Sequence, residues 1–276
     1  MGIHTGALDD RREPTAHQVE HFGDRGWVRV DGVLTPDEVA AHRGAIGAAV
    51  ERVRSTTAPL EQRSTYGKAF LQLMNLWRVD PVIERLVLAP RLAGLAAALL
   101  GVERVRVYHD QALFKEPGGG VTPWHQDALY WPLDGRRCIT MWMPLIDVVP
   151  EMGTMTFAEG SHRAGRLGDA AISDESEADF ARLVDGGGFG LGGPGALSAG
   201  DATFHAGWTL HRASPNVTGT MREVMTVIWF ADGLVVQEPA NREQHRDLAT
   251  WLPGCRPGDP AASPLNPLVP SPAPAP

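Results

Sequence analysis

The chain has 276 residues, of which 43% are hydrophobic and 21% charged, and its formal net charge at pH 7 is −8. This length suits one domain with a sizeable core, and the acidic balance argues against a nucleic-acid partner, because phosphate backbones are bound by net-basic faces. No run approaches the roughly 18 apolar residues of a membrane span, and the N-terminus lacks a signal peptide's apolar core. We expect a cytoplasmic protein and predict no membrane or protein partner.

Helical signals dominate the first hundred residues, after a polar N-terminus at 1–14 that is expected to be mobile. Thr15 with Gln18 three residues later is typical of a capping box and predicts a short helix. Thr35-Pro36-Asp37-Glu38 combines an N-cap residue, proline at the first helical position and glutamate three residues after the cap, so a helix begins here and runs to about Arg54. The other elements expected before residue 102 are a strand at 27–30 and helices at 81–88 and 91–100, the last ended by Gly101.

From residue 102 the pattern of apolar residues changes from helical to alternating, so a β core is expected at 102–235. Short strands separated by Gly, Pro and Asp are typical of a jelly roll, also called a double-stranded β-helix. We therefore predict a mainly β, cupin-like fold supported by N-terminal helices at 15–101. The expected strands are 105–107, 112–114, 138–145, 153–157, 196–198, 202–205 and 223–230.

The C-terminal part is expected to hold one helix within 236–255, which closes a single domain at 15–255. From residue 256 to 276 the sequence is rich in Pro and Ala with nothing to bury, which predicts a disordered tail. The glycine-rich run at 188–193 formally fits a dinucleotide fingerprint, but Pro194-Gly195 follows where a helix must begin. We interpret this run as a loop near the mouth of the active site. Cys138 and Cys255 are expected to be ordinary reduced thiols.

Trp124-His125-Gln126-Asp127 places a histidine and a carboxylate two residues apart. On an extended strand both side chains point to the same face and can bind one metal ion. His211, 86 residues later, completes the set if the intervening chain folds back. Two histidines and one carboxylate on one face of an octahedral ion leave three positions open, as in non-haem Fe(II) oxygenases. His125, Asp127 and His211 are therefore the predicted metal ligands and the catalytic centre.

The spacing of a histidine and an acid alone is a weak signal. Ten histidines and 33 acidic residues in 276 positions give about 1.2 chance matches, and the chain has two. The second match, His245-Arg246-Asp247, lies in a polar, helix-like stretch at 241–252 with no histidine after it. We interpret it as a solvated helix face and not as a metal site.

Three segments in order carry a resemblance to a known family: WHQD at 124–127, GTMTFAEGSHR at 153–163 and GDATFHAGWTLH at 200–211. Their combination and spacing resemble the phytanoyl-CoA dioxygenase family of Fe(II)- and 2-oxoglutarate-dependent oxygenases, over roughly residues 20–235. The resemblance implies Fe(II) as the metal, with 2-oxoglutarate and O2 as co-substrates.

Arg222 is a lone cation just before an apolar strand, eleven residues after His211. A guanidinium can pair a carboxylate with two parallel hydrogen bonds. In the family that the chain resembles, an arginine at this offset binds the distal carboxylate of 2-oxoglutarate. A structural ion pair with Glu223 or another acid is the alternative. The resemblance also implies 2-oxoglutarate contacts for Gln111, Trp142 and Lys68, while Ala213 stands where the family has a hydroxyl.

Aromatic residues beside the motifs predict a pocket suited to an apolar or ring-containing substrate. Core packing is the alternative for each of them. We expect His205 to support the site or to contact substrate, and for His162 a surface loop is equally compatible with the sequence. The predicted substrate-contacting residues are Tyr130, Trp131, Phe157, His162 and Trp208.

Together these signals predict an Fe(II)- and 2-oxoglutarate-dependent dioxygenase that hydroxylates a small molecule, of the secondary-metabolite kind, with release of succinate and CO2. No basic cluster is shaped for a coenzyme A diphosphate, so phytanoyl-CoA is not the expected substrate. The alternatives are a jelly-roll module whose histidines are structural or bind a passive metal, and a cupin-type enzyme that uses a metal without 2-oxoglutarate.

Overall fold

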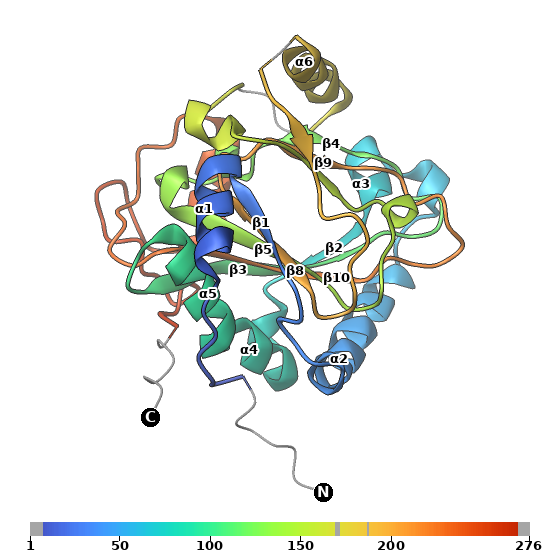
Figure 1. Cartoon of the computed structure of the whole chain (residues 1–276), viewed down its shortest axis with the longest axis horizontal. Helices are drawn as coiled ribbons and strands as arrows, with labels where there is room; N and C mark the ends of the chain where they lie inside the picture. The colour runs from blue at the N-terminus through green and yellow to red at the C-terminus, as the bar shows by residue number, and fades with distance from the viewer. Residues whose placement is uncertain (1–7, 169–171, 187, 270–276) are drawn as a thin grey trace, which may run out of the picture.

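The structure is a computed structural model that describes residues 8–168, 172–186 and 188–269. Two antiparallel sheets of six and four strands form the core, and helices from the first hundred residues pack against the larger sheet (Figure 1). This arrangement is the predicted mainly β, double-stranded β-helix fold with flanking N-terminal helices. No helix in the described ranges is long and apolar enough to cross a membrane.

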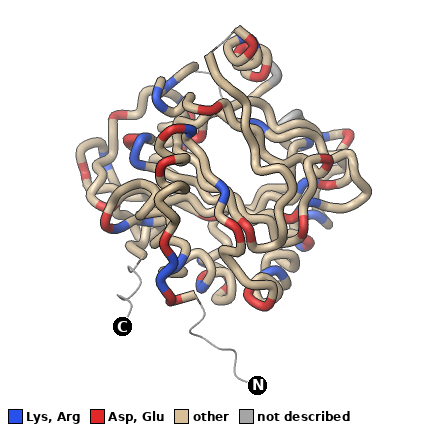
Figure 2. The backbone as a smooth tube through the Cα atoms, in the orientation of Figure 1, with Lys and Arg blue, Asp and Glu red and all other residues tan. Residues whose placement is uncertain are grey.

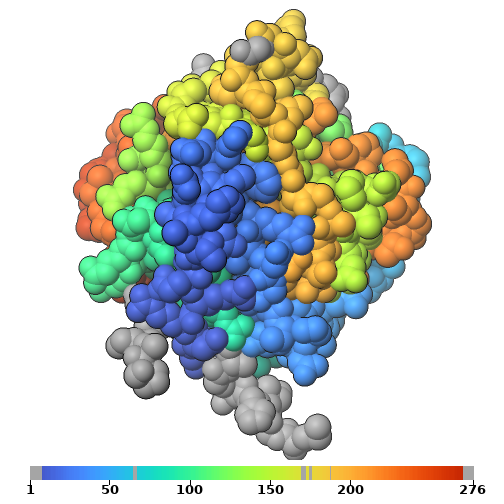
Figure 3. Space-filling model, viewed as in Figure 1, coloured from blue at the N-terminus to red at the C-terminus, as the bar shows by residue number. Residues whose placement is uncertain are grey.

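The larger sheet has the strand order β1-β8-β5-β10-β3-β2, so strands far apart in the sequence lie side by side. β1 pairs with β8, and in Figure 3 the blue N-terminal segment accordingly lies beside the orange part of the chain around residue 200. Near the middle of the sheet, β10 pairs with β5 on one side and β3 on the other. The strands are β1 (Trp27–Val30), β2 (Leu71–Met74), β3 (Val105–Phe114), β5 (Cys138–Pro144), β8 (Ala202–Ala206) and β10 (Val224–Ala231).

The smaller sheet has the order β4-β9-β6-β7. It brings together β4 and β9, which carry the two predicted histidine ligands and pair directly with each other. Its strands are β4 (Thr122–His125), β6 (Met155–Ala158), β7 (Leu191–Gly192) and β9 (His211–Ala213).

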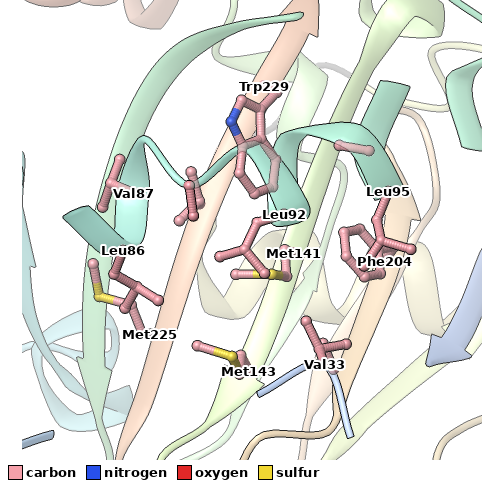
Figure 4. Close-up of a cluster of buried hydrophobic side chains, with 14 of the residues drawn as sticks. Val33, Leu86, Val87, Leu92, Leu95, Met141, Met143, Phe204, Met225 and Trp229 are labelled. Carbon is pink, nitrogen blue, oxygen red and sulfur yellow. The ribbon is translucent and has the colours of Figure 1, made fainter. Parts of the chain in front are cut away.

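Side chains alternate between the two faces of β10, so one face of the larger sheet packs in the hydrophobic core and the other lines a cavity. Met225, Val227 and Trp229 point to the outer face, where they pack in the main hydrophobic core. Leu86 and Leu92 from two helices meet these side chains in the close-up of Figure 4. The intervening residues of β10 point to the inner face, because successive side chains of a strand face opposite ways. The inner face is therefore left to line a cavity between the two sheets.

The four N-terminal helices that the sequence predicted lie within one residue of their expected bounds. Thr15 and Thr35 both form complete capping boxes, and Gly101 ends a helix with a φ of 65°. The helices are α1 (Ala16–Arg25), α2 (Pro36–Arg54), α3 (Thr65–Ala69), α4 (Pro81–Val87), α5 (Pro90–Leu100), α6 (Asp174–Asp185) and α7 (Arg242–Trp251). Short 3-10 turns lie at η1 (Leu60–Gln62), η2 (Leu76–Arg78), η3 (Asp127–Leu129), η4 (Gly135–Arg137), η5 (Pro150–Met152) and η6 (Ser161–Ala164).

Several strand predictions need correction. Residues 105–107 and 112–114 belong to one continuous strand, β3, and residues 196–198 form only an isolated bridge between Leu197 and Val148. The glycine-rich run contributes Leu191–Gly192 to β7, and none of residues 188–193 lines the cavity. No strand or helix was predicted at the positions of β2, β7, β9, α3 and α6.

The C-terminal tail is not disordered over its described length. Residues 256–269 fold back onto β3, where Val107 donates its backbone N–H to Pro267 and Asn266 is fully buried. Ala261, Leu265 and Val269 are buried, so the tail has apolar anchors that its Pro-rich composition concealed. Residues 270–276 of the predicted tail lie outside the described residues. At the other end, Arg91 pairs with Asp10, within the segment expected to be mobile.

Charged residues are interspersed over the molecule, as Figure 2 shows. Cys138 and Cys255 are both free thiols, as expected. Burial raises the pKa of the Cys138 thiol above its ordinary range. Cys138 therefore behaves as a small apolar core residue.

Candidate active site

A cavity of about 610 Å³ lies between the two sheets. The three predicted metal ligands line it, together with side chains from the inner face of the larger sheet and from α7. This volume lies within the range of roughly 300–1,000 Å³ that is common for small-molecule sites.

The pairing of β4 with β9 sets the positions of the two histidines. His125 and His211 are directly opposite each other in the register, and their rings lie 4.1 Å apart between centroids. The sequence predicted Asp127 on the same strand as His125. In the structure, Asp127 instead begins the short turn η3. Because Gln126 between them is still extended, the Asp127 side chain returns to the same face as His125. One ligand atom from each residue lies within 4.8 Å of the others.

Backbone carbonyls orient both imidazoles. The Nδ1 atom of His125 lies 2.7 Å from the Pro123 carbonyl oxygen, and that of His211 lies 2.9 Å from the Thr209 carbonyl. A carbonyl can only accept, so each Nδ1 carries the proton and each Nε2 keeps a free lone pair. The two Nε2 atoms lie 3.5 and 3.7 Å from Oδ1 of Asp127. Three electron-pair donors thus converge on one point.

Asp127 is fixed through its other carboxylate oxygen. Thr140 donates to Oδ2 at 2.8 Å, and His205 Nε2 lies 3.2 Å from the same atom. Burial alone would raise the pKa of Asp127, but the hydrogen bond from His205 is among the interactions that hold it below the ordinary value. Asp127 therefore stays ionised, with Oδ1 left for a cation.

The donor set fits the iron that the family resemblance implies. Burial lowers the pKa of both His125 and His211, so both imidazoles are neutral, as metal ligands must be. Two neutral imidazoles and one carboxylate at one side of a cavity match the facial arrangement of non-haem Fe(II) oxygenases. His205 supports the carboxylate, which is one of the roles expected for it.

Glu177 of α6 joins the two ligand strands from outside the cavity. Its Oε2 accepts from the backbone N–H of Trp124 at 2.7 Å, and its Oε1 accepts from Arg212 at 3.1 Å. Trp124 precedes His125, and Arg212 follows His211. One carboxylate therefore holds together the neighbours of both histidine ligands.

Arg222 occupies the end of the cavity near Trp142. Its side chain is buried and lies over the Trp142 ring, 5.3 Å from the centroid, while Nη1 donates to the Gly153 carbonyl. Its Nε has no hydrogen-bond partner among the described residues. Burial lowers the pKa of Arg222 to about 9, which leaves it charged at neutral pH. The alternative ion pair with Glu223 is wrong, because Glu223 binds Arg43 through two hydrogen bonds.

A second buried basic group lies beside Arg222. Lys115 exchanges backbone hydrogen bonds with Arg222, and its Nζ donates to the carbonyls of Gly120 and Ser214 and, at 3.3 Å, to the Thr122 hydroxyl. Burial and the charge of Arg222 lower the pKa of Lys115 to about 6. Arg222 lines this end of the cavity with Lys115 behind it, and neither side chain contacts a carboxylate among the described residues, so this end suits an anion.

Of the residues predicted to bind 2-oxoglutarate, Gln111, Trp142 and Arg222 line the cavity and Lys68 does not. The Lys68 backbone carbonyl accepts from Gly120, so this lysine lies near the anion-binding end without facing it. Ala213 lines the cavity with no hydroxyl, and the residue directly opposite it on β4 is Thr122.

Of the predicted substrate-contacting residues, Tyr130 and Trp131 line the cavity and the other three do not. Phe157 stacks on Trp27 at 4.7 Å between centroids and supports the histidines from behind. Trp208 packs against a separate hydrophobic cluster, and the imidazole of His162 lies against the Gly23 carbonyl. These three side chains point away from the cavity lining, because neighbouring residues in sequence need not share a face of the sheet.

Sequence reasoning missed the cavity residues at the end near α7. His109 is an unremarked residue of β3, and Asp247 was interpreted as part of a solvated helix face. That interpretation is wrong, since Asp247 is only 5% exposed and lines the cavity with Trp251. Asp247 and Trp251 are four residues apart, which places both on one side of a helix. This spacing was the sequence signal that could have predicted a shared, buried face.

A model of the family described as phytanoyl-CoA dioxygenase (PhyH) matches residues 22–224. The phytanoyl-CoA dioxygenase domain-containing protein 1 of Danio rerio is 25% identical, over 82% of this chain and 94% of its own length. The L-proline trans-4-hydroxylase of Streptomyces griseoviridis is 31% identical, over 54% of this chain and 56% of its own.

Two solved structures are similar along almost the whole chain. SnoK, an alpha-ketoglutarate-dependent non-haem carbocyclase from nogalamycin biosynthesis, has a TM-score of 0.74 and 26% identity, covering 93% of this chain and 96% of SnoK. The epimerase SnoN, in complex with Fe3+, alpha-ketoglutarate and nogalamycin RO, has a TM-score of 0.72 and 26% identity, covering 92% and 97%. Alpha-ketoglutarate is 2-oxoglutarate. The chain is thus a non-haem iron, 2-oxoglutarate-dependent dioxygenase for small molecules, and it belongs to the phytanoyl-CoA dioxygenase family.

Proposed function

We propose that His125, Asp127 and His211 bind the Fe(II) of this dioxygenase, that Arg222 binds 2-oxoglutarate, and that a ring-containing small molecule is hydroxylated. One observation carries this proposal. The two free Nε2 lone pairs and Oδ1 of Asp127 converge in the same cavity whose end holds a buried guanidinium without an acidic partner. A metal-binding jelly roll without 2-oxoglutarate has no use for that guanidinium.

Each residue has a defined task in this reaction. Thr140 and His205 hold Oδ2 of Asp127, so Oδ1 faces the histidines and the ligand geometry is set before the metal arrives. Arg222 holds the distal carboxylate with its fork of N–H donors, which fixes the direction of the co-substrate. When bound, iron with 2-oxoglutarate and O2 supplies the oxidising chemistry that releases succinate and CO2.

The end of the cavity opposite Arg222 is left for the substrate. Tyr130, Trp131 and Trp251 line it with aromatic faces, which suit a ring. SnoK and SnoN, the structurally similar enzymes, belong to nogalamycin biosynthesis. This likeness supports a biosynthetic metabolite as the substrate, and oxygen insertion into one of its C–H bonds as the outcome.

Succinate formation tests the assignment. The wild-type protein should convert 2-oxoglutarate to succinate in air only when Fe(II) is added, slowly without a substrate and faster with one. His125→Ala should lose this conversion, because one of three ligands is gone. His162→Ala is the matched control, since His162 lies outside the cavity, and it should keep the wild-type rate. Equal succinate formation by His125→Ala and wild type would show that the metal lies elsewhere.

A further inference from the structure

An irregularity in β3 gives the cavity an additional polar wall. The register of β3 with β10 pairs Ile228 with His109 and then Trp229 with Val107, so Tyr108 is the extra residue of a β-bulge. A bulge redirects side chains, and such bulges are frequent next to active sites. Here Tyr108 and His109 lie beside each other with ring centroids 5.0 Å apart, although alternation would send them to opposite faces.

Both bulge residues meet α7. The Tyr108 hydroxyl donates to Oδ2 of Asp247 at 3.2 Å, and the His109 ring lies 5.1 Å from the Trp251 ring between centroids. Asp247 and Trp251 are four residues apart on α7 and therefore share one side of the helix. Bulge and helix together form one corner of the cavity.

This corner lies one level of the larger sheet away from the Arg222 end of the cavity. Gln111, two residues along β3 from His109, pairs with Thr226, which also lies opposite Trp142. Trp142 lies under the Arg222 guanidinium, so this level of the sheet belongs to the anion-binding end. His109 lies at the next level, opposite Ile228. The corner therefore stays open to a substrate when 2-oxoglutarate is bound at Arg222.

The corner has an excess of negative charge and of hydrogen-bond acceptors. Two acids of α7, Glu243 and Asp247, line it with one cation, Arg246. Arg246 binds Glu243 at 2.6 Å through Nη2, while its Nε is 4.0 Å from Asp247. The two acids therefore share one cation, which lies closer to Glu243 than to Asp247. The His109 side chain is 2% exposed, and its Nδ1 has no hydrogen-bond partner among the described residues.

Three aromatic rings complete the corner. Trp251, Trp131 and Tyr130 all line the cavity, and the rings of Trp251 and Trp131 lie beside those of His109 and Tyr108 respectively. Aromatic faces attract cations, and they do so more strongly where water is excluded. A buried carboxylate, a buried imidazole and aromatic faces suit a positively charged nitrogen better than a carboxylate or a phosphate.

We propose that His109 and Asp247 bind the protonated amine of a ring-bearing substrate, with its nitrogen held against Trp251. The proposed substrate class is therefore an amine. This inference rests on the proposed function, because it requires that 2-oxoglutarate is bound at Arg222. Asp247 accepts from the ammonium group with the oxygen that Tyr108 leaves free, and neutral His109 accepts through its unprotonated nitrogen.

The experiment compares three indole probes on the anaerobic Fe(II)–2-oxoglutarate complex by calorimetry: tryptamine, tryptophol and indole-3-propionate. They share a ring and differ in carrying an amine, an alcohol or an acid. Tryptamine should bind at least tenfold more tightly than the other two, because charge-assisted hydrogen bonds to a buried acid exceed neutral ones. Asp247→Asn should lower the affinity for tryptamine about tenfold and leave the affinity for tryptophol unchanged. His109→Leu should also weaken tryptamine binding, and it tests the site independently of Asp247→Asn.

Asp179→Asn is the matched control, since it removes one exposed acid of α6 and should leave tryptamine affinity unchanged. The proposal is overturned if tryptamine binds no more tightly than tryptophol, if it does not bind, or if Asp247→Asn and His109→Leu retain full affinity. The visible charge-transfer band of the iron–2-oxoglutarate complex is recorded first. Its absence would refute the proposed function, whereas a normal band without amine preference refutes this inference alone.

Discussion

At the scale of single residues, Arg222 separates a 2-oxoglutarate enzyme from a metal-binding jelly roll. Replacing it by methionine should leave the iron site intact, because no ligand is touched. The co-substrate carboxylate would then be buried without a partner, at a cost of about 3 to 5 kcal/mol. We expect 2-oxoglutarate affinity to fall by roughly two to three orders of magnitude, at about 1.4 kcal/mol per decade. Anaerobic titration of iron-loaded protein measures it.

Arg222→Lys should bind 2-oxoglutarate with intermediate affinity, since a point charge keeps the attraction but loses the planar fork. Arg43→Met is the control, because Arg43 is the exposed arginine that pairs with the neighbouring Glu223. It should bind as tightly as wild type. Wild-type affinity in Arg222→Met would mean that this arginine is structural.

Asp247 should make the stability of the substrate-free protein depend on pH. Burial raises its pKa to about 7, and the groups facing it are Tyr108, His109, Glu243 and Arg246. A carboxyl whose pKa is raised by folding favours the folded state less as pH rises from the unfolded pKa to the folded one. Between pH 5 and pH 8, wild type should therefore lose about 3 kcal/mol relative to Asp247→Asn, at about 1.4 kcal/mol per pKa unit. Urea unfolding at both pH values measures it, and parallel pH profiles would contradict it.

Residue identity predicted the side chains that converge at the proposed metal site better than those that line the proposed substrate end. His125, Asp127 and His211 follow from donor chemistry and a spacing that survives in the fold. His109 could not be predicted, because it faces the cavity only through a bulge that depends on pairing with β10. Asp247 looked solvated because its neighbours on the exposed side of α7 are polar.

At the scale of elements, the paired strands β4 and β9 form the centre of the site. The Thr122 hydroxyl lines the cavity directly opposite Ala213, where it can donate to a carboxylate of 2-oxoglutarate. Thr122→Val should therefore weaken 2-oxoglutarate binding about tenfold, the effect of one charge-assisted hydrogen bond. Thr203→Val is the control, because Thr203 is buried outside the cavity with an unpartnered hydroxyl. Unchanged affinity in Thr122→Val would exclude this contact.

The carboxylate of Glu177, on α6, binds to the same two strands. Glu177→Ala removes hydrogen bonds from Trp124 and Arg212, so β4 and β9 lose a common support. We expect Fe(II) affinity to fall about tenfold, the lower end of what outer-shell partners contribute. Fe(II) titration in the absence of oxygen measures this, with Asp179→Asn on the same helix as the control. Equal affinities in Glu177→Ala and wild type would confine Glu177 to a surface role.

Elements were predictable where their signals are local. Thr15, Thr35 and Gly101 mark helix ends through contacts within three residues, and the structure keeps all three. The strand β9 has only three residues, and it exists because β4 and β6 lie on either side of it. Such pairing depends on contacts across the whole chain, which no short window of sequence contains.

At the scale of the whole molecule, the two faces of the larger sheet divide stability from function. The outer face is closed by α4 and α5 through the core around Leu92 and Met141 (Figure 4). The inner face is left open towards the smaller sheet, with an anion-binding end at Arg222 and an acidic, aromatic end at α7. The general fold could be predicted from the spacing of short strands in the sequence. The chemical difference between the two ends of the cavity could not, because it depends on how distant segments pack together.

The most direct test of the account is anaerobic addition of Fe(II) and then 2-oxoglutarate, followed by the visible charge-transfer band. Wild type should develop the band at one Fe(II) per chain, because chelation of 2-oxoglutarate to iron requires both halves of the site. His211→Ala should show no band and His162→Ala should show the full band. A full band in His211→Ala, or no band in wild type, would contradict the account.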